Sequence, residues 1–370
     1  MIRHVYIHIP FCHRICPYCA FYKHQPGKNN PDRFVDALVQ EARFHASHLK
    51  VRPSTLFLGG GTPSLLTGAQ LESLFEGLGE AFELDALTEC SIEANPKTFG
   101  PGKASTMQRI GINRVSLGVQ SWNPHQLGQL GRDHSPQEAA DSIQILRAAG
   151  FTNLSIDLMF SLPGQTKEEW ESELYHTCQF KPDHLSCYNL TYEEDTEFLA
   201  RLQRGELREC GEETDETCFT MAERILSDQG FLHYETSNYA LPGFTSRHNQ
   251  AYWRGHDYLG LGPSAVSTIQ GRRWKNLPDT ERYTRLGLKG AFADLPREQE
   301  ELSPRDLHNE RIALSLRTQE GLAASQLDPS LNETRNLLIE QNLLVLEEGF
   351  LRLTGRGKPL VDAVAVELTL

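Results

Sequence analysis

Short runs of apolar residues alternate with segments of helical periodicity along the chain up to about Gln229. The first apolar run, Val5–Ile9, has strand character. The next segment, Asp32–Leu49, has a helical stripe that contains Phe34 and Leu38. The same succession of strand and helix recurs five times, and six such units in a row predict a parallel sheet. The other predicted strands are Thr55–Leu58, Cys90–Ala94, Arg114–Val119, Leu154–Phe160 and Leu185–Leu190, and the other predicted helices are Gly68–Phe82, Gly102–Ile110, Ser135–Ala149, Lys167–Phe180 and Thr214–Gln229.

Polar residues and glycines stand at the carboxyl ends of the predicted strands. Cysteines follow the first strand, and Gly59–Thr62 follow the second. Glu93 and Gln120 close the third and fourth strands, and Asp157 lies within the fifth. In parallel α/β folds, functional groups gather at these strand ends. Five adjacent strand ends that enclose one ligand require a curved sheet, so we predict a partial (β/α)6 barrel of the TIM type and not an open, doubly wound sheet.

The strand–helix period breaks after the sixth unit. Tyr234–Tyr239 has the pattern of one further strand, whereas His248–Trp253 and Tyr258–Ser264 have the composition of loops. From about Glu298 the pattern changes to helices around a small hairpin, which predicts a winged-helix-like appendage. Its predicted elements are helices over Asn309–Arg317, Glu333–Gln341 and Gly357–Leu368 and a hairpin over Leu343–Leu353.

These patterns divide the chain into a barrel (1–232), a linking segment (233–297) and a C-terminal domain (298–370). A length of 370 residues with 39% hydrophobic residues suits a barrel with a small appendage. The formal net charge of -13 argues against a broad nucleic-acid surface. No apolar stretch approaches the ~20 residues of a membrane span, and the amino terminus has no signal-peptide layout. We therefore expect a cytoplasmic protein with no nucleic-acid partner.

Cys12, Cys16 and Cys19 form a C-x3-C-x2-C run. Three thiolates at this spacing can hold three irons of a [4Fe-4S] cluster and leave the fourth iron open to a small molecule. Zinc is the alternative, because a closed structural zinc site needs four ligands and His8 or His13 is available as the fourth. The spacing favours the cluster. It is the radical S-adenosylmethionine (SAM) signature, in which SAM chelates the open iron.

Other residues near the strand ends are candidates for binding SAM. The glycines of Gly59–Thr62 let backbone approach a ligand closely, although a tight turn has the same composition. Glu93 can accept hydrogen bonds from ribose hydroxyls, or it is simply an exposed acid at a strand end. Burial of Asp157 costs several kcal/mol unless it is paired. Arg132 is its candidate partner, either beside the adenosine or in a purely structural ion pair.

His248 begins the segment His-Asn-x-x-Tyr-Trp. An imidazole beside aromatic rings suits haem ligation or porphyrin stacking, while an ordinary surface or core histidine is the alternative. Arg272, Arg273 and Lys275 lie further along the chain and could meet the propionates of a porphyrin. A solvated basic stretch is the alternative for these three residues.

In combination, these segments resemble the HemN/HemW group of radical SAM proteins from Tyr6 to the C-terminal appendage. The matching segments are Tyr-Ile-His-Ile-Pro-Phe-Cys, Gly-Gly-Gly-Thr-Pro-Ser, Glu-Ala-Asn-Pro, Arg-Val-Ser-Leu-Gly-Val-Gln-Ser, Asp-Leu-Met-Phe-Ser-Leu-Pro-Gly-Gln-Thr and Tyr-Glu-Thr-Ser-Asn-Tyr-Ala. The resemblance implies that the three cysteines hold a [4Fe-4S] cluster. It implies that Tyr6, Gly60 and Glu93 contact the cluster-bound SAM. The positions that contact a second SAM in the oxidase branch of the group are Tyr18, Gly61, Thr62, Gln120, Arg132, Asp157 and Thr191.

The group contains two functions, an oxygen-independent coproporphyrinogen III oxidase and a haem chaperone. The oxidase pattern is C-x3-C-x2-C-x-C, but this chain has Phe21 at the last position. The oxidase also carries a segment before its first strand, whereas here that strand starts near Val5. The haem-associated motif of the chaperone branch is intact at His248. We therefore expect a haem chaperone with His248 as its haem contact, and keep the oxidase, a radical SAM enzyme for another substrate and a zinc module as alternatives.

The resemblance also carries expectations about partners. Haem is the expected cargo, and acceptor haem proteins, including membrane-associated respiratory proteins, are the expected partners. A peripheral visit to the membrane and a homodimer that depends on the cluster are further expectations.

Overall fold

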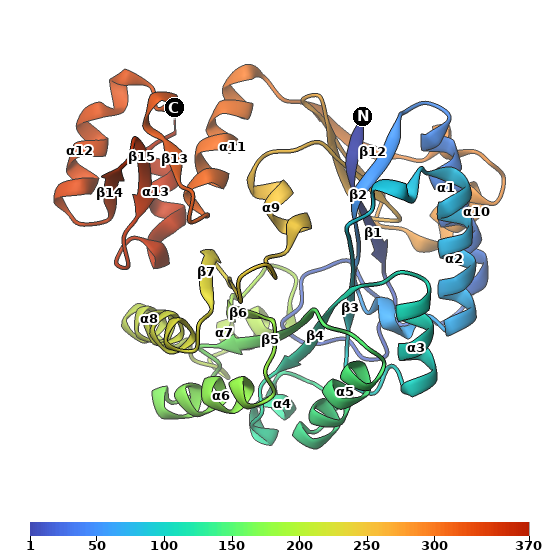
Figure 1. The fold of residues 1–370 in the computed structure, drawn as a ribbon, viewed down its shortest axis with the longest axis horizontal. Coiled ribbons are helices and arrows are strands. Elements are labelled where there is room, and N and C mark those ends of the chain that lie inside the picture. Colours follow the sequence, from blue (N-terminus) through green and yellow to red (C-terminus); the bar gives the residue numbers. More distant parts are fainter. Residues whose placement is uncertain (370) are drawn as a thin grey trace.

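The computed structural model describes residues 1–369. Its main sheet has the strand order β12-β11-β10-β9-β1-β2-β3-β4-β5-β6-β8-β7. Strands β1 to β6 pair in parallel in chain order, and helices cover their outer side (Figure 1). The sheet does not close, which confirms the predicted partial barrel. The six units are β1 Ile2–Ile9, α1 Pro31–Ala46, β2 Val51–Gly60, α2 Gly68–Ala81, β3 Glu89–Ala94, α3 Pro101–Arg109, β4 Arg114–Gln120, α5 Pro136–Ala148, β5 Leu154–Phe160, α6 Lys167–Gln179, β6 His184–Asn189 and α8 Glu212–Asp228, with short helices α4 Pro124–Gln129 and α7 Glu197–Gln203 between them.

Local sequence sets where several barrel helices begin. Helices α2, α5 and α6 start after Thr67, Ser135 and Thr166, and each of these hydroxyls accepts the backbone N–H three residues later. A Gln or Glu at that later position bonds back to the cap, which completes a capping box in all three helices. Each cap satisfies backbone donors that the first helical turn leaves open.

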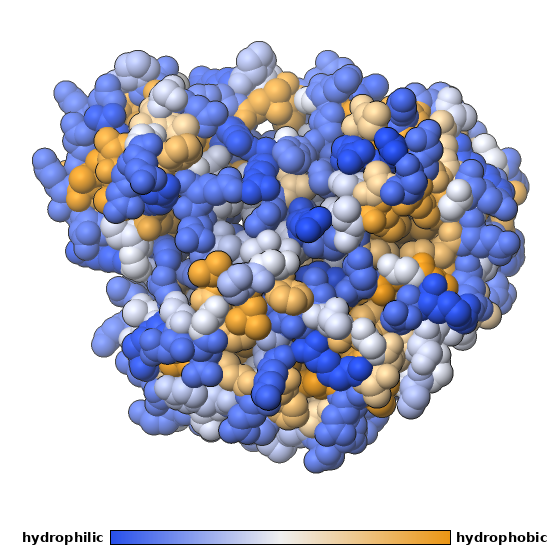
Figure 2. All heavy atoms as spheres, viewed as in Figure 1, coloured by the Kyte–Doolittle hydropathy of each residue, from blue (hydrophilic) through white to orange (hydrophobic). Residues whose placement is uncertain are grey.

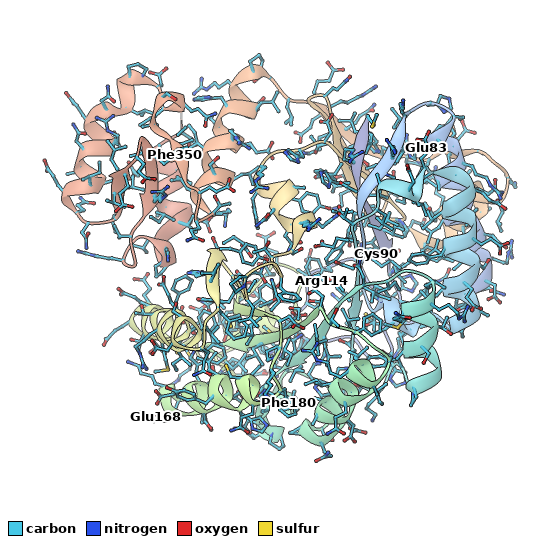
Figure 3. All side chains as sticks on the ribbon, in the orientation of Figure 1. Glu83, Cys90, Arg114, Glu168, Phe180 and Phe350 are labelled. Atoms are coloured by element: carbon cyan, nitrogen blue, oxygen red, sulfur yellow. The ribbon has the colours of Figure 1, made fainter. Side chains whose placement is uncertain are left out.

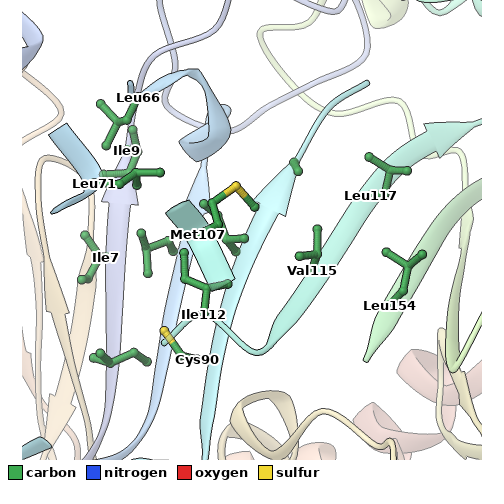
Figure 4. Close-up of a cluster of buried hydrophobic side chains, with 14 of the residues drawn as sticks. Ile7, Ile9, Leu66, Leu71, Cys90, Met107, Ile112, Val115, Leu117 and Leu154 are labelled. Atoms are coloured by element: carbon green, nitrogen blue, oxygen red, sulfur yellow. The ribbon is translucent and has the colours of Figure 1, made fainter. Parts of the chain in front are cut away.

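Alternation along the strands separates the packed core from the inner face of the barrel. Ile7 and Ile9 of β1 are fully buried and lie near Leu66 and Leu71 in the cluster drawn in Figure 4. Because successive side chains of a strand point to opposite faces, Tyr6 and His8 project to the inner face. The same period that builds the core therefore delivers polar groups to the interior of the barrel.

The chain after α8 forms more regular structure than its sequence predicts. The expected strand over Tyr234–Tyr239 is wrong, because a turn divides it into β7 (Leu232–Glu235) and β8 (Asn238–Ala240). The segment expected to be a loop around His248 is helix α9 (Arg247–Trp253), which Ser246 caps. The expected loop at Tyr258–Ser264 begins with strand β9 (Tyr258–Leu261), which pairs in parallel with β1.

Strand β9 extends the main sheet on the side of β1 that faces away from β2. Antiparallel strands follow it, so residues 258–301 belong to the same twelve-stranded sheet as the barrel. The sequence reading missed these elements, which are β10 Val266–Ile269, β11 Arg272–Asn276, β12 Arg297–Glu301 and helix α10 Thr280–Gly287.

The C-terminal part has a hydrophobic core of its own, to which Ile312, Leu351 and Val364 belong. The predicted hairpin is present, and its turn lies at Glu348 and Gly349, both of which have positive φ. Figure 2 shows hydrophobic side chains exposed over this part of a mostly hydrophilic face. Within residues 1–369, no helix is long and apolar enough to cross a membrane. The elements are α11 Pro304–Leu316, β13 Leu322–Ala323, α12 Asn332–Glu340, β14 Leu344–Glu347, β15 Phe350–Leu353 and α13 Val361–Glu367.

Candidate cofactor and ligand sites

The three cysteines of the C-x3-C-x2-C run line one cavity of about 610 Å³ at the carboxyl ends of the barrel strands, which we call the cluster cavity. Cys12 is buried, and Cys16 and Cys19 are half-buried. Burial raises the pKa of the free Cys12 thiol to about 11. The cations of Lys23 and Arg132 line the same cavity and favour the thiolates that iron requires. This donor set fits a three-cysteine cluster with one open iron.

Both histidines named as a fourth zinc ligand already have partners within the protein. His8 is engaged at both ring nitrogens, by the Tyr6 hydroxyl at 3.1 Å and by the Tyr22 carbonyl at 2.8 Å. His13 lies 2.9 Å from a carboxylate oxygen of Asp133. Within residues 1–369, no three His, Cys, Asp or Glu side chains converge as ligands of one ion. The three cysteines therefore suit a cluster with one open iron better than a closed zinc site, which needs four ligands.

A hydrogen-bond chain joins two strand ends and the loop after α4 to the cysteine loop. The backbone N–H of Thr62 donates to the carbonyl of Phe11 at 2.8 Å, and its hydroxyl donates to Sγ of Cys12 at 3.5 Å. The same hydroxyl accepts from the side-chain amide of Asn95 at 3.1 Å. Arg132 in turn donates to the Asn95 carbonyl oxygen at 2.8 Å. The ends of β2 and β3 and the loop after α4 therefore set the position of Cys12.

The glycine-rich turn after β2 is required by packing within the protein. Gly60 has φ +106°, and a Cβ there would lie 2.5 Å from the His8 ring. A Cβ on Gly61 would lie 2.8 Å from the Ile9 carbonyl oxygen. Packing alone therefore accounts for both glycines, and both also line the cluster cavity, where close approach to a ligand stays a prediction.

Residues expected to contact the cluster-bound SAM lie around a shared wall. Glu93 accepts the N–H of Gly60 at 3.0 Å, and burial, followed by the nearby Asp157 carboxylate, raises its pKa to about 7. Glu93 and Gly60 line both the cluster cavity and a larger neighbouring cavity. Tyr6 lines the larger cavity. Glu93 and Gly60 therefore lie at the boundary between the two spaces, whereas Tyr6 faces only the larger one.

The structure brings the candidate residues for a second SAM to one place, but with different partners from those expected. No ion pair joins Arg132 and Asp157 in the part of the chain that the structure describes. Asp157 instead accepts from the hydroxyls of Ser116 at 2.9 Å and Ser155 at 3.1 Å. Arg132 donates to the Gly118 carbonyl at 2.7 Å. The candidates that line the cluster cavity are Tyr18, Gly61, Thr62, Gln120, Arg132, Asp157 and Thr191.

The larger cavity has a volume of about 1170 Å³ and lies between β1, β2, α9, β11 and α11. It shares a wall with the cluster cavity, which includes Cys19, Phe21, Lys23 and Tyr188. Its volume exceeds the ~300–1,000 Å³ of ordinary small-molecule pockets. A large flat ligand in this cavity would therefore lie next to the cysteine loop.

His248 lies in the wall of the larger cavity and is fully buried. Its Nδ1 lies 2.7 Å from the Thr55 hydroxyl, and its Nε2 lies 2.8 Å from the Tyr252 hydroxyl. Burial, with smaller contributions from His4 and Arg114, lowers the pKa of His248 to about 3. Arg114 itself is buried below α9 in Figure 3. His248 is therefore a neutral imidazole with both ring nitrogens engaged.

Glu89 anchors the helix that carries His248. Its two carboxylate oxygens accept the backbone N–H groups of Arg247 at 2.8 Å and His248 at 2.9 Å, where the first turn of a helix has open donors. The sequence reading missed both Glu89 and Thr55. The available signal was a polar residue in or directly beside a predicted apolar strand, because a buried polar group needs a partner.

Strand alternation separates the three basic residues predicted to meet propionates. Arg273 and Lys275 of β11 line the larger cavity. Arg272 is one position out of phase, on the opposite face of the strand, and its exposed side chain fits the alternative of a solvated basic residue. Arg273 already donates to Glu310 at 2.6 Å.

Comparison with known proteins agrees with this geometry. The family model of the radical SAM superfamily matches residues 6–174, and that of the HemN C-terminal domain matches residues 302–360. The solved structure of the coproporphyrinogen III oxidase HemN from Escherichia coli, described as a radical SAM enzyme, aligns with a TM-score of 0.85 at 25% identity. The alignment covers 100% of this chain and 90% of the HemN chain. The cysteine loop on a partial barrel thus defines a radical SAM protein.

Proteins of similar sequence identify the family within the radical SAM proteins. The heme chaperone HemW of Lactococcus lactis is 35% identical over 97% of this chain and 95% of its own length. Its namesake in Escherichia coli is 36% identical over 80% and 78% of the two chains. The mouse radical S-adenosyl methionine domain-containing protein 1, mitochondrial, is 32% identical over 98% and 86%. This chain belongs to the HemW family.

Proposed function

We propose that this protein is a haem chaperone, which binds haem in the larger cavity and passes it to acceptor haem proteins. The observation that carries the proposal is a cavity of about 1170 Å³ that shares a wall with the cluster cavity and has α9 in its lining. The haem-associated motif predicted from the sequence lies on that helix. Near full-length relatives named heme chaperone HemW support the same function.

The radical SAM core would hold its cofactors in the cluster cavity. Cys12, Cys16 and Cys19 would bind a [4Fe-4S] cluster, which supplies electron transfer and an open iron when bound. Gly60, Glu93 and Tyr6 would bind SAM at that iron. Arg132 and Lys23 supply positive charge beside the thiolates. If a second SAM binds, the candidate residues given for it above, which line the same cavity, would hold it there.

Two cations are available for the carboxylates of haem in the larger cavity. Lys275 and Arg311 line it, and neither forms an ion pair with a carboxylate within residues 1–369. Arg311 donates only to the backbone carbonyl of Arg254 among its described side-chain bonds. His248 is the proposed haem contact, and the structure supports an indirect contact, through the Tyr252 hydroxyl that it holds at the cavity wall.

The proposal extends to partners and location. The proposed location is the cytoplasm. The proposed acceptors include membrane-associated respiratory proteins, which the protein would reach by peripheral association with the membrane. Self-association is proposed to depend on the cluster, since the cysteine loop carries the exposed side chains of Ile15 and Phe21. Size measurement with and without reconstituted cluster tests this part.

Haem titration followed by transfer tests the function. Anaerobically reconstituted protein is titrated with haem and the Soret band is followed, and the loaded protein is then mixed with apomyoglobin as a generic acceptor. Saturable, near-stoichiometric binding and transfer faster than haem release into buffer are expected. Absence of saturable binding would remove the proposal.

The oxidase remains the second candidate, because the HemN structure matches the whole of this chain. Phe21 stands where the oxidase pattern has its last cysteine, and its side chain is 69% exposed at the wall between the cavities. Anaerobic incubation with coproporphyrinogen III, SAM and a reductant separates the candidates. We expect no protoporphyrinogen, and its accumulation would establish the oxidase.

A further inference from the structure

Three imidazoles line the larger cavity, those of His8, His248 and His256. Both ring nitrogens of His8 and of His248 have hydrogen-bond partners within the protein. His256 is different. Its Nδ1 lies 3.3 Å from Nε2 of His4, whereas its Nε2 has no partner within residues 1–369. Since a metal binds through a ring nitrogen with a free lone pair, His256 is the cavity histidine that can accept iron without breaking a bond.

The exposure of these side chains points the same way. His248 and His8 are 0% and 5% exposed, so a planar macrocycle can reach neither ring without displacing the wall. His256 is exposed in the loop that follows α9. An exposed histidine is often an ordinary surface residue, but this one lines the cavity and has its other nitrogen held by the protein.

The ring of His256 is oriented by a buried relay. It stacks on the ring of His4, with centroids 5.4 Å apart and an interplanar angle of 23°. Nδ1 of His4 lies 3.0 Å from the Thr55 hydroxyl, which also bonds Nδ1 of His248. Metal-binding histidines commonly have their second nitrogen fixed in this way, which sets the tautomer and strengthens the ligand.

Surrounding charges keep His256 in its ligating form. Partial burial, followed by the cations of Arg254 and Arg311, lowers its pKa, and Asp257 opposes them weakly. The neutral imidazole is the form that binds a metal. Of these neighbours, Arg311 lies with Lys275 in the cavity wall where the carboxylates of haem would lie.

We propose that Nε2 of His256 is the axial ligand of the haem iron in the larger cavity, and that His4 and Thr55 are positioning residues that fix its ring. The inference rests on the proposed haem-chaperone function and names the iron-binding residue of the same site. Ligation forms one iron–nitrogen bond and releases the water or hydroxide that the free haem carries at that position. The oxidation state of the iron does not change.

The test compares the intact protein with His256→Ala and with His48→Ala, an exposed histidine outside the cavity. Haem affinity is measured by Soret titration, and the iron–histidine stretch of the ferrous complex by resonance Raman scattering. We expect His256→Ala to weaken haem binding at least tenfold and to remove the iron–histidine band. Added imidazole should restore the band, and His48→Ala should match the intact protein.

A second pair of variants tests the positioning residues. Thr55→Val keeps the shape of the side chain but removes the hydroxyl, and Thr55→Ser keeps the hydroxyl. Loss of the relay should lower the iron–histidine stretching frequency in Thr55→Val, and Thr55→Ser should restore it. Far-UV circular dichroism and thermal unfolding confirm that each variant is folded.

The outcomes separate the inference from the function beneath it. An intact protein that binds haem, with an iron–histidine band that survives in His256→Ala, overturns the inference and leaves the chaperone. Loss of the band in a folded His248→Gln but not in His256→Ala assigns the iron to His248 and also overturns it. If the intact protein binds no haem, the proposed haem-chaperone function itself is refuted.

Discussion

The hydroxyl of Thr62 donates to Sγ of Cys12 over 3.5 Å while it accepts the side-chain amide of Asn95. A cysteine ligand is thereby tied to the ends of two barrel strands. Hydrogen bonds to ligand sulfurs raise the reduction potential of an iron–sulfur cluster. Thr62 therefore links the geometry of the sheet to the redox properties proposed for the loop.

Replacing Thr62 tests this link. Thr62→Val keeps the side-chain volume but removes both the donor to Cys12 and the acceptor for Asn95. We expect a more negative midpoint potential after anaerobic reconstitution, measured by a redox titration followed by electron paramagnetic resonance. Thr62→Ser is the matched control and should restore the potential. Equal potentials in all three proteins would show that this bond has no effect on the cluster.

Gly60 should not tolerate a side chain. Its φ of +106° disfavours any L-residue, and a Cβ would lie 2.5 Å from the His8 ring. Gly60→Ala should destabilise the protein by about 1–3 kcal/mol or more. It should also lower the iron content after reconstitution. Gly102→Ala in helix α3 is the control, because its Cβ would meet nothing within 4 Å. Urea unfolding that gives the same stability for both variants would contradict this reasoning.

Glu89 should matter for stability although it belongs to no cofactor site. It is 4% exposed and accepts two backbone N–H groups at the start of α9. Glu89→Gln replaces one acceptor oxygen with a donor, so one buried N–H loses its partner, at a cost of about 1–3 kcal/mol. Glu83→Gln at an exposed position should change stability by no more than ~0.5 kcal/mol. Urea titration measures both, and indistinguishable midpoints would refute the anchoring role.

Glu235 should make stability depend on pH. It is buried in β7, and burial raises its pKa from 4.5 to about 7. The unfolded chain therefore releases this proton near pH 4.5, while the folded protein holds it until about pH 7. Because the unfolded state binds fewer protons in this window, the free energy of unfolding should fall as pH rises from about 4.5 to 7, by on the order of 3 kcal/mol.

Glu235→Gln isolates that contribution. The amide keeps the size of the side chain and, like the protonated carboxyl, one acceptor oxygen beside the donors of Asn238 and Ser237, but it does not titrate. Relative to the intact protein, the variant should gain stability at pH 8 compared with pH 5. Urea unfolding at the two pH values gives the difference, which cancels the other titrating groups. A difference that is independent of pH would contradict the raised pKa.

The six barrel strands could be predicted because buried parallel strands are continuous apolar runs with helices between them. Ser135 and the proline after it also predicted the start of α5 correctly. Helix α9 could not be found in this way, since seven residues are too few to show a helical period. Strand β9 pairs with β1, and a contact between residues so far apart in the chain leaves no local pattern.

The sequence predicted which residues belong to the candidate site better than it predicted their hydrogen-bond partners. The lining of the cluster cavity includes every expected cysteine and every residue expected at the second SAM. Which partners these residues choose depends on side-chain positions that spacing does not specify. Asp157 is therefore bonded to serines rather than to Arg132, and His248 is enclosed where an accessible ligand was expected.

The pairing of β9 with β1 also sets an order of events during synthesis. All residues that line the cluster cavity lie between Cys12 and Glu193, so the ribosome completes that site with almost half the chain still to come. The larger cavity needs α9, β11 and α11. Strand β9 emerges roughly 250 residues after β1, which corresponds to roughly 10–50 s of translation. A nascent chain would thus contain every residue of the proposed cluster site well before it contains those of the proposed haem site.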